Sequence, residues 1–291
     1  MKKFLLIVIF LFEISSVNAQ RLNSPWETVA PSGSYVFNDL KTAIKDANTC
    51  YRLELSGIDF LKDKKLLSKA ASLNQLMALR LVNNNLTELP SSFLYFQSLK
   101  YFYSAGNPFA TISDSIGMWS ELRFLELSGT NFDTLPVGFF SCGRLQSILI
   151  NENKDTLKIT NAISSLGKTL VELKIYSTKT DTLPDAMKEM VKLKKLVLYK
   201  CGLNEIPAAV LKMDMLQELW LDSNSINIIP RNITSMQSLT HLSLKGNRIV
   251  HIPSTICFMQ NLLTLDLRGN PIDPYEIHVL QALLPSCEIL F

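Results

Sequence analysis

Apolar residues recur along the chain with a period of 23 residues. When the first apolar residue of each unit is taken as position 1, ten units begin at Cys50, Leu76, Leu99, Leu122, Leu145, Leu170, Leu193, Leu216, Leu239 and Leu262. Seven of the nine spacings between these residues are 23, and the other two are 26 and 25. A period of this length predicts a solenoid, in which each unit buries its apolar side chains against its neighbours.

Positions 4 and 6 of the units are almost always apolar, as at Leu219 and Leu221, whereas the residues beside them vary. Apolar residues two apart predict a short strand with one buried face. Because side chains alternate along a strand, positions 3, 5 and 7 are expected to face outward on the opposite side of the sheet.

Two further positions, 9 and 15, hold a characteristic residue in most units. Position 9 is asparagine in six units, at Asn84, Asn107, Asn153, Asn224, Asn247 and Asn270. Thr130, Thr178 and Cys201 replace it elsewhere, and Ile58 breaks the pattern in the first unit. A small amide is suited to bonding backbone groups that a turn leaves unpaired. Position 15 is proline in six units, at Pro90, Pro136, Pro184, Pro207, Pro230 and Pro253, where it ends the strand region and starts the return segment.

The stretch from Leu216 to Met236 has the form L-x-x-L-x-L-x-x-N-x-L-x-x-L-P-x-x-I-x-x-M, which resembles a leucine-rich repeat. The 23-residue length and the Leu-Pro step are similar to the Ras-suppressor-like class, which also occurs in exported bacterial proteins. The resemblance covers roughly residues 50–291. It implies an α/β solenoid shaped as a horseshoe, with about ten repeats, a parallel β-sheet on the concave face and short helical caps at both ends.

The pattern divides the chain into five parts. Residues 1–19 read as a signal peptide, since Lys2 and Lys3 precede a nine-residue apolar run and small residues precede Gln20. Residues 20–34 are expected to be a flexible lead-in with little structure. Residues 35–49 are expected to form an N-terminal cap, in which Asn38 or Asp39 would be the N-cap of a short helix. Residues 50–272 are expected to form the repeats, and residues 273–291 a C-terminal cap.

One unit departs from the period. Residues 151–169 are two residues longer than their equivalents and lack the proline. Two interpretations remain open. The extra residues loop out on the rim, where solenoids place insertions, or they bulge and change the local curvature beside a binding patch.

The charge and hydropathy of the chain bear on which partners and which location are expected. The net charge is +3, of which the signal region contributes +1 through Lys2, Lys3 and Glu13, and no long basic run is present, so a nucleic-acid partner is not expected. No later stretch is long and apolar enough to predict a transmembrane anchor. The protein is therefore expected to be exported, whether secreted, periplasmic or on the cell surface, and to be a monomer.

The titratable residues do not form a recognisable active site. Five cysteines without close spacing predict neither a disulfide framework nor a zinc site, so we expect no metal and no cofactor. His241, Ser243 and Glu218 would lie side by side on a flat sheet without an oxyanion donor, so no catalytic residues are assigned and the protein is not expected to be an enzyme. Four triplets beginning at Asp114, Asp133, Asp155 and Asp181 resemble an O-glycosylation signal of some exported bacterial proteins, and whether they are modified stays open.

Two groups of aromatic residues occupy the outward positions. The early aromatic cluster consists of Tyr101, Tyr103 and Phe124, in the third and fourth units. The later aromatic cluster consists of Tyr176, Tyr199 and Trp220, in the sixth to eighth units, with Lys174, Val197 and Asp222 beside it. Exposed aromatic side chains flanked by charges are typical of binding surfaces, although aromatic residues on neighbouring strands also pack simply against one another.

We therefore expect a non-enzymatic recognition module that binds a protein or peptide partner on the concave face, above all through the later aromatic cluster. The alternative is a surface scaffold or a glycan-binding protein that uses the same aromatic residues to stack on sugar rings.

Overall fold

A computed structural model describes residues 25–60, 62, 64–180 and 182–291. The predicted signal peptide, residues 1–19, and the first part of the predicted lead-in, residues 20–24, lie outside the described residues.

Within the described residues, the strands form one parallel sheet in which each strand pairs with the next along the chain. The strands are β1 (Val36–Phe37), β2 (Arg52–Ser56), β3 (Ala78–Val82), β4 (Tyr101–Ala105), β5 (Phe124–Ser128), β6 (Ser147–Asn151), β7 (Glu172–Tyr176), β8 (Lys195–Tyr199), β9 (Glu218–Trp220), β10 (His241–Ser243), β11 (Thr264–Asp266) and β12 (Glu288–Leu290). Equivalent repeat positions pair across strands, as Leu196 does with Leu219. The predicted repeat period therefore sets which residues pair between neighbouring strands.

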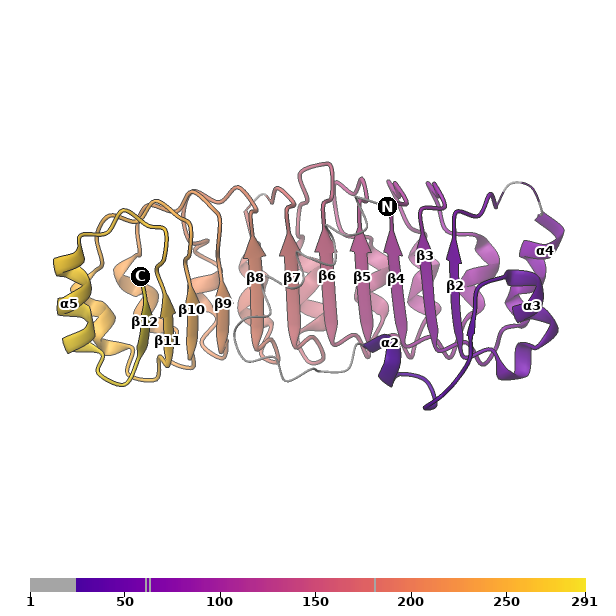
Figure 1. The fold of residues 1–291 in the computed structure, drawn as a ribbon, viewed down its shortest axis with the longest axis horizontal. Coiled ribbons are helices and arrows are strands. Elements are labelled where there is room, and N and C mark those ends of the chain that lie inside the picture. Colours follow the sequence, from indigo (N-terminus) through magenta and orange to yellow (C-terminus); the bar gives the residue numbers. More distant parts are fainter. Residues whose placement is uncertain (1–24, 61, 63, 181) are drawn as a thin grey trace.

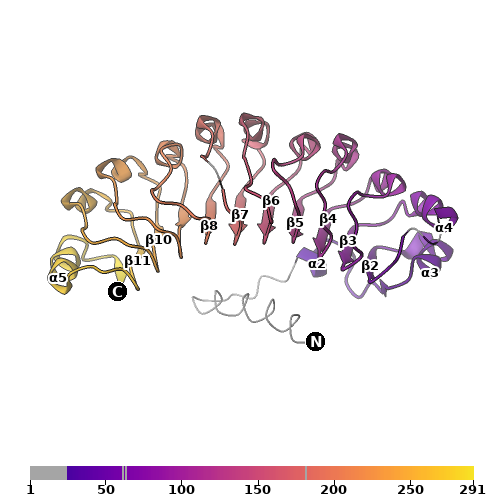
Figure 2. The same cartoon turned by 90° about the horizontal axis from the view of Figure 1, so that it is seen from above.

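The solenoid is curved, with the strands on its inner side and short helices on its outer side (Figures 1 and 2). The outer segments are α4 (Lys64–Lys69) and the 3-10 helices η3 (Ala70–Ser72), η4 (Ser91–Tyr95), η5 (Asp114–Met118), η6 (Val137–Ser141), η7 (Asn161–Leu166), η8 (Asp185–Glu189), η9 (Val210–Lys212), η10 (Arg231–Ser235) and η11 (Ser254–Phe258). Several of them begin directly after the proline of position 15, as η10 does after Pro230. The chain therefore has the predicted fold, an α/β leucine-rich-repeat solenoid with a parallel sheet on its concave face.

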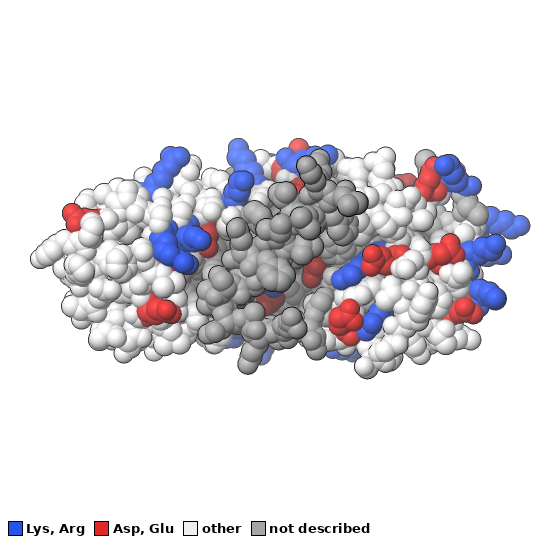
Figure 3. Space-filling model, in the orientation of Figure 1, with Lys and Arg blue, Asp and Glu red and all other residues white. Residues whose placement is uncertain are grey.

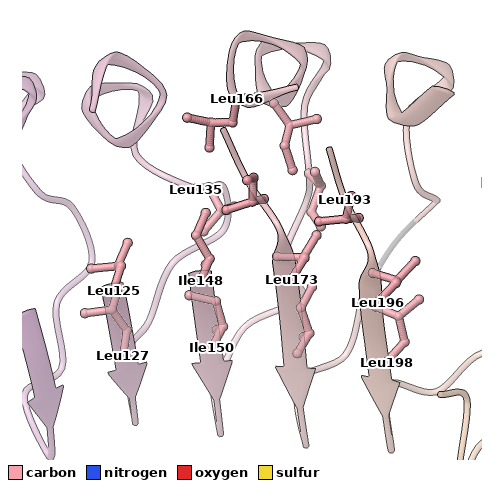
Figure 4. Close-up of a cluster of buried hydrophobic side chains, with 14 of the residues drawn as sticks. Leu125, Leu127, Leu135, Ile148, Ile150, Leu166, Leu173, Leu193, Leu196 and Leu198 are labelled. Atoms are coloured by element: carbon pink, nitrogen blue, oxygen red, sulfur yellow. The ribbon is translucent and has the colours of Figure 1, made fainter. Parts of the chain in front are cut away.

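The core lies between the sheet and the outer helices. Side chains of positions 4 and 6 point from each strand toward the outer segments and stack in rows, as Leu173, Leu196 and Leu198 do in Figure 4. These rows are fully buried, and each leucine contributes roughly 1.5–3 kcal/mol relative to an exposed side chain. Cys50, Cys142 and Cys201 lie in the same core as free thiols, and burial raises the pKa of each of them to about 12.

Position 8 ends the inner segment of every unit with a left-handed backbone. Its φ angle lies between 46° and 70° at Gly57, Asn83, Gly106, Gly129, Glu152, Ser177, Lys200, Ser223 and Gly246, and is 72° at Gly269. Glycine adopts this conformation without steric cost, which accounts for its presence at this position in five of the ten units. The turn directs the chain away from the sheet and brings position 9 inside.

The asparagines of position 9 form the expected ladder between units. Asn224 donates to Leu198 O at 2.7 Å and to Leu221 O at 2.8 Å, and its Oδ1 accepts from the backbone N–H groups of Cys201 and Leu203. Asn107 makes the equivalent bonds to Leu81 O, Asn84 N and Leu86 N. Each buried amide thus supplies partners for backbone groups that the turns leave without strand bonds.

Both ends carry the predicted helical caps. At the N-terminal end, α3 (Leu40–Lys45) begins after Asp39, whose carboxylate accepts from Thr42 N at 2.8 Å, and the 3-10 helix η2 (Ala47–Thr49) follows. At the other end, α5 (Pro274–Leu283) begins after Asp273, which accepts from Tyr275 N at 2.8 Å. Strands β1 and β12 extend the sheet over the first and last repeats, so the core is covered at both ends.

The long unit, residues 151–169, places its extra residues at the rim. Its loop rises beyond its neighbours between β6 and β7 (Figure 1), and two isolated parallel bridges, Thr134 to Lys158 and Leu157 to Thr180, join it to the units on either side. Leu157 and Ile163 remain buried, so the unit keeps its core contacts. The insertion thus lies at the rim, as the first interpretation expects, and whether it also changes the local curvature beside a binding patch stays open.

Candidate binding face

The later aromatic cluster lies on three adjacent strands of the concave face. Tyr176 pairs with Tyr199 in the register of β7 and β8, and their ring centroids are 6.0 Å apart at an interplanar angle of 47°. Trp220 pairs with Val197 across β8 and β9. The three aromatic side chains are half-buried, whereas Val197 is only 5% exposed, although its register position faces outward. The cluster is therefore a partly open aromatic surface with a buried valine opposite Trp220 in the register.

Trp220 is held by two charged neighbours, Lys195 and Glu218, that the sequence analysis did not assign to the later aromatic cluster. Its Nε1 donates to Glu218 Oε2 at 3.1 Å, and Lys195 Nζ lies 5.1 Å from the centroid of its ring. Lys195 and Glu218 also form an ion pair across β8 and β9 at 2.7 Å. Burial alone would raise the pKa of Glu218, but the bonds from Lys195 and Trp220 outweigh it and hold that pKa below its ordinary value. The indole is thus pre-oriented with its face toward a cation.

Partly buried polar groups surround the aromatic rings. Burial raises the pKa of Tyr176 to about 12, with a smaller contribution from Glu172 and Asp222. Burial also raises the pKa of Asp222, which accepts a hydrogen bond from Ser243 Oγ. Lys174 forms an ion pair with Glu172 on the same strand. Lys174 is thus paired with a carboxylate, and Asp222 is hydrogen-bonded to a hydroxyl, so a ligand would meet polar groups that already have partners around an aromatic centre.

The early aromatic cluster is in a different state, because the chain's own N-terminal segment lies over it. The short helix α2 (Pro25–Thr28) places Trp26 against Ala78 and Tyr101, with the Trp26 and Tyr101 ring centroids 6.0 Å apart. Trp26 is 3% exposed and Tyr101 1% exposed, while Tyr103 and Phe124 pack partly buried around them. The expectation that residues 20–34 have little structure is therefore wrong for Pro25–Thr28, and Tyr101 is not an exposed contact residue.

The catalytic reading of His241 and Ser243 finds no geometric support. His241 Nδ1 is 2.8 Å from Thr240 Oγ1, and the Ser243 hydroxyl donates to Asp222. Among the residues described, no three histidine, cysteine, aspartate or glutamate side chains are grouped so that they could hold a metal ion. In the same part of the chain, no helix is long and apolar enough to span a bilayer.

Charge is not segregated on the visible parts of the concave side. Figure 3 shows lysine and arginine side chains interspersed with aspartate and glutamate side chains on both ends of this face. Several of them are paired across neighbouring strands, such as Arg80 with Glu54 at 3.5 Å. A mixed surface of this kind favours a specific partner over a polyanion.

The sequence analysis did not assign three residues of this face to a binding site. Lys195 and Glu218 occupy position 3 on adjacent strands with opposite charges, and that pairing was a readable signal. Trp26 lies outside the repeats, so its position over β3 and β4 could not follow from the repeat register. A tryptophan in the predicted lead-in was its main trace in the sequence.

Comparisons with known proteins agree with this architecture. A leucine-rich-repeat family model matches residues 191–249 and 214–272. An internalin from Listeria monocytogenes is similar in fold, with a TM-score of 0.62 and 16% identity over 89% of this chain and 78% of the internalin. The plant peptide hormone receptor RGFR1, whose structure is in complex with RGF2, gives a TM-score of 0.61 and 19% identity over 89% of this chain and 46% of the receptor.

A second plant receptor is somewhat more similar in sequence. The Arabidopsis receptor kinase HAESA, in complex with the peptide hormone IDA and the co-receptor SERK1, gives a TM-score of 0.55 and 25% identity over 70% of this chain. The chain spans less than half of either plant receptor, 46% of RGFR1 and 36% of HAESA. No curated protein sequence matches the chain.

Proposed function

We propose that this chain, a leucine-rich-repeat protein, is an exported, non-enzymatic recognition module that binds a protein or peptide on its concave face. The observation that carries the proposal is the half-buried aromatic surface of Tyr176, Tyr199 and Trp220. Large aromatic side chains that are already held in place lose little conformational entropy on binding, and tyrosine and tryptophan dominate binding hot spots.

The fixed orientation of Trp220 supports the same conclusion. Its ring is bonded to Glu218 and faces Lys195, so the contact surface exists before a partner arrives. The HAESA complex supports a peptide-sized partner by analogy, since that receptor kinase is in complex with a peptide hormone. A protein or peptide segment that lays apolar side chains over the rings would use this surface best.

The proposal is tested with the double variant Tyr199→Ala/Trp220→Ala. The matched control is Tyr95→Ala/Phe258→Ala, which removes two aromatic side chains that are exposed outside the concave strands. Partners captured from the native source by the unmodified protein are identified by mass spectrometry, and their affinities are measured for all three proteins. Loss of two hot-spot residues should weaken the cognate partner at least ~30-fold, while the control keeps its affinity.

Unchanged affinity of the folded Tyr199→Ala/Trp220→Ala protein would refute the binding site. A glycan array on the same proteins addresses the alternative, because Tyr176 and Tyr199 offer adjacent ring faces for sugars. Binding of a defined glycan that the double variant loses, without any protein partner, would replace the protein-binding proposal.

Export is tested separately. N-terminal sequencing of the mature protein should find Gln20 as the first residue if the predicted signal peptide is removed. Recovery of intact Met1 from the native source would contradict export by this route.

A further inference from the structure

The contact between α2 and the sheet is built from side chains of a recognition type. The Trp26 ring packs against Ala78 and Tyr101, and the guanidinium carbon of Arg80 lies 4.1 Å from its ring centroid. The same guanidinium lies 5.8 Å from the ring centroid of Tyr103, so Arg80 contacts both aromatic rings. A buried aromatic anchor beside a guanidinium is a common arrangement at hot spots.

Glu27, the residue after Trp26, adds a charged contact with Arg52. Glu27 Oε2 lies 3.3 Å from Arg52 Nη1, and the Glu27 carbonyl accepts from Arg52 Nη2 at 2.7 Å. Arg52 is 5% exposed, and its buried Nε has no hydrogen-bond partner among the described residues. The guanidinium is thus a buried cation whose donors the Glu27 carboxylate satisfies only in part. A carboxylate placed across Nε and Nη would satisfy it better.

The segment is bound to the sheet but is not part of it. Its backbone bonds are local, from Val29 N to Pro25 O and from Ser34 N to Pro31 O. Its contact with β2–β4 runs through Trp26, through the partly buried Val29 and through Glu27, which meets the Arg52 side chain. The segment can therefore leave the face without breaking a strand ladder, as a bound peptide would.

We infer that the surface formed by Arg52, Ala78, Arg80, Tyr101 and Tyr103 is a peptide subsite for an aromatic residue followed by a carboxylate, which the chain's own Trp26 and Glu27 occupy. A partner with the same aromatic–acidic pair displaces α2 and opens this half of the concave face. The subsite lies on β2–β4 and is separate from the later aromatic cluster, so it stands or fails independently of the proposed function.

The test uses the full chain with Trp26→Ala/Glu27→Ala, which empties the subsite. The probe is a fluorescently labelled peptide with the sequence of residues 25–32, PWETVAPS. Fluorescence anisotropy should show saturable binding to the variant. Binding to the unmodified chain should be at least ~10-fold weaker, because the tethered segment competes at an effective concentration on the order of millimolar.

Controls assign the binding to the two side chains and to this surface. A peptide with alanine in place of the tryptophan should bind the variant at least about 10-fold more weakly. A peptide with glutamine in place of the glutamate should bind it more weakly by up to about fivefold, because the exposed carboxylate is screened by solvent. Adding Arg80→Ala to the variant should remove binding. Adding Tyr199→Ala/Trp220→Ala should leave it unchanged, which distinguishes this subsite from the proposed partner site.

Two results would overturn the inference. One is the absence of saturable binding to the folded variant at millimolar peptide, and the other is equal affinity for the variant and the unmodified chain. If the double variant does not fold, Glu27→Lys takes its place, because a lysine beside Arg52 repels the segment and leaves the core unchanged. The same two results with Glu27→Lys would then decide against the subsite.

Discussion

The two halves of the concave face carry similar residues in different states. On β4 and β5 the aromatic residues lie under α2, and Tyr101 is 1% exposed. On β7–β9, Tyr176, Tyr199 and Trp220 likewise occupy outward positions of the repeat, and their side chains are half-buried. The difference shows that an outward register position is necessary for a binding residue but does not make the residue available.

This comparison of the two halves assumes that their buried cores are equally stable. Substitutions in the asparagine ladder test the assumption, and they are expected to change the free energy of unfolding more than any other variant discussed below. Asn107→Ala and Asn224→Ala each leave buried backbone N–H and C=O groups without partners, so each should lower the free energy of unfolding by about 3 kcal/mol. The measurement is urea denaturation followed by circular dichroism. Asn227→Ala, at an exposed position, is the control. A loss confined to one half would show that the halves differ in their core as well.

The second prediction contrasts two tryptophans. Trp26→Ala removes a side chain that is 3% exposed and should lower the free energy of unfolding by about 2 kcal/mol. Trp220→Ala removes a half-buried ring on the open half and should cost less than about 1 kcal/mol. Equal losses in the same denaturation experiment would mean that α2 contributes no more to folding than the open cluster does.

The third prediction uses the pH dependence of stability. The pKa of Tyr176 is about 12 in the folded protein, above the ordinary value of 10, so the folded state favours the neutral phenol. This contribution is fully present below pH ~10 and is lost as the pH rises toward 12, by about 1 kcal/mol at pH ~11. Tyr176→Phe should therefore lose less thermal stability than the unmodified protein between pH ~9 and ~11. Tyr275→Phe, on the exposed surface of α5, is the control, and an equal effect of both variants would contradict the assignment.

The smallest effect concerns the ion pairs of the two halves. Glu27→Gln removes the charge that faces Arg52, but Glu27 is 59% exposed, so solvent screening limits the loss of stability to less than about 1 kcal/mol. The same change should increase hydrogen exchange at Val29 N, because α2 then leaves the sheet more often. Glu218→Gln, which removes the partner of Lys195, should not change exchange in this segment. Slower exchange after Glu27→Gln would argue against the role of this pair in holding α2.

Much of the fold follows from the sequence because a solenoid depends on contacts between neighbours. The 23-residue period predicts the pairing of Leu196 with Leu219, and the position of Asn224 predicts its bonds to the preceding unit. The left-handed backbone at position 8 also has a signal in the sequence, since glycine occupies that position in five of ten units. The structure shows this backbone conformation in all ten units. These features repeat, so each unit confirms the interpretation of the others.

The candidate site was only partly readable. The register places Tyr176, Tyr199 and Trp220 side by side, and their half-buried state is compatible with contact by a partner. The register does not show that Val197 is buried between its neighbours, or that Glu218 and Lys195 orient the indole. Such details depend on side-chain conformations, which a period does not specify.

By itself, the sequence determined which side chains face the core and which face the concave side, because strand alternation and the repeat period fix both through contacts between adjacent units. Only the tertiary structure decided which outward side chains remain accessible. Trp26 and Glu27 belong to no repeat, and their contacts with Tyr101 and Arg52 join segments that no local pattern relates. Among the described residues, a single non-repeating segment, held mainly by Trp26 and Glu27, therefore covers one of the two aromatic clusters and not the other.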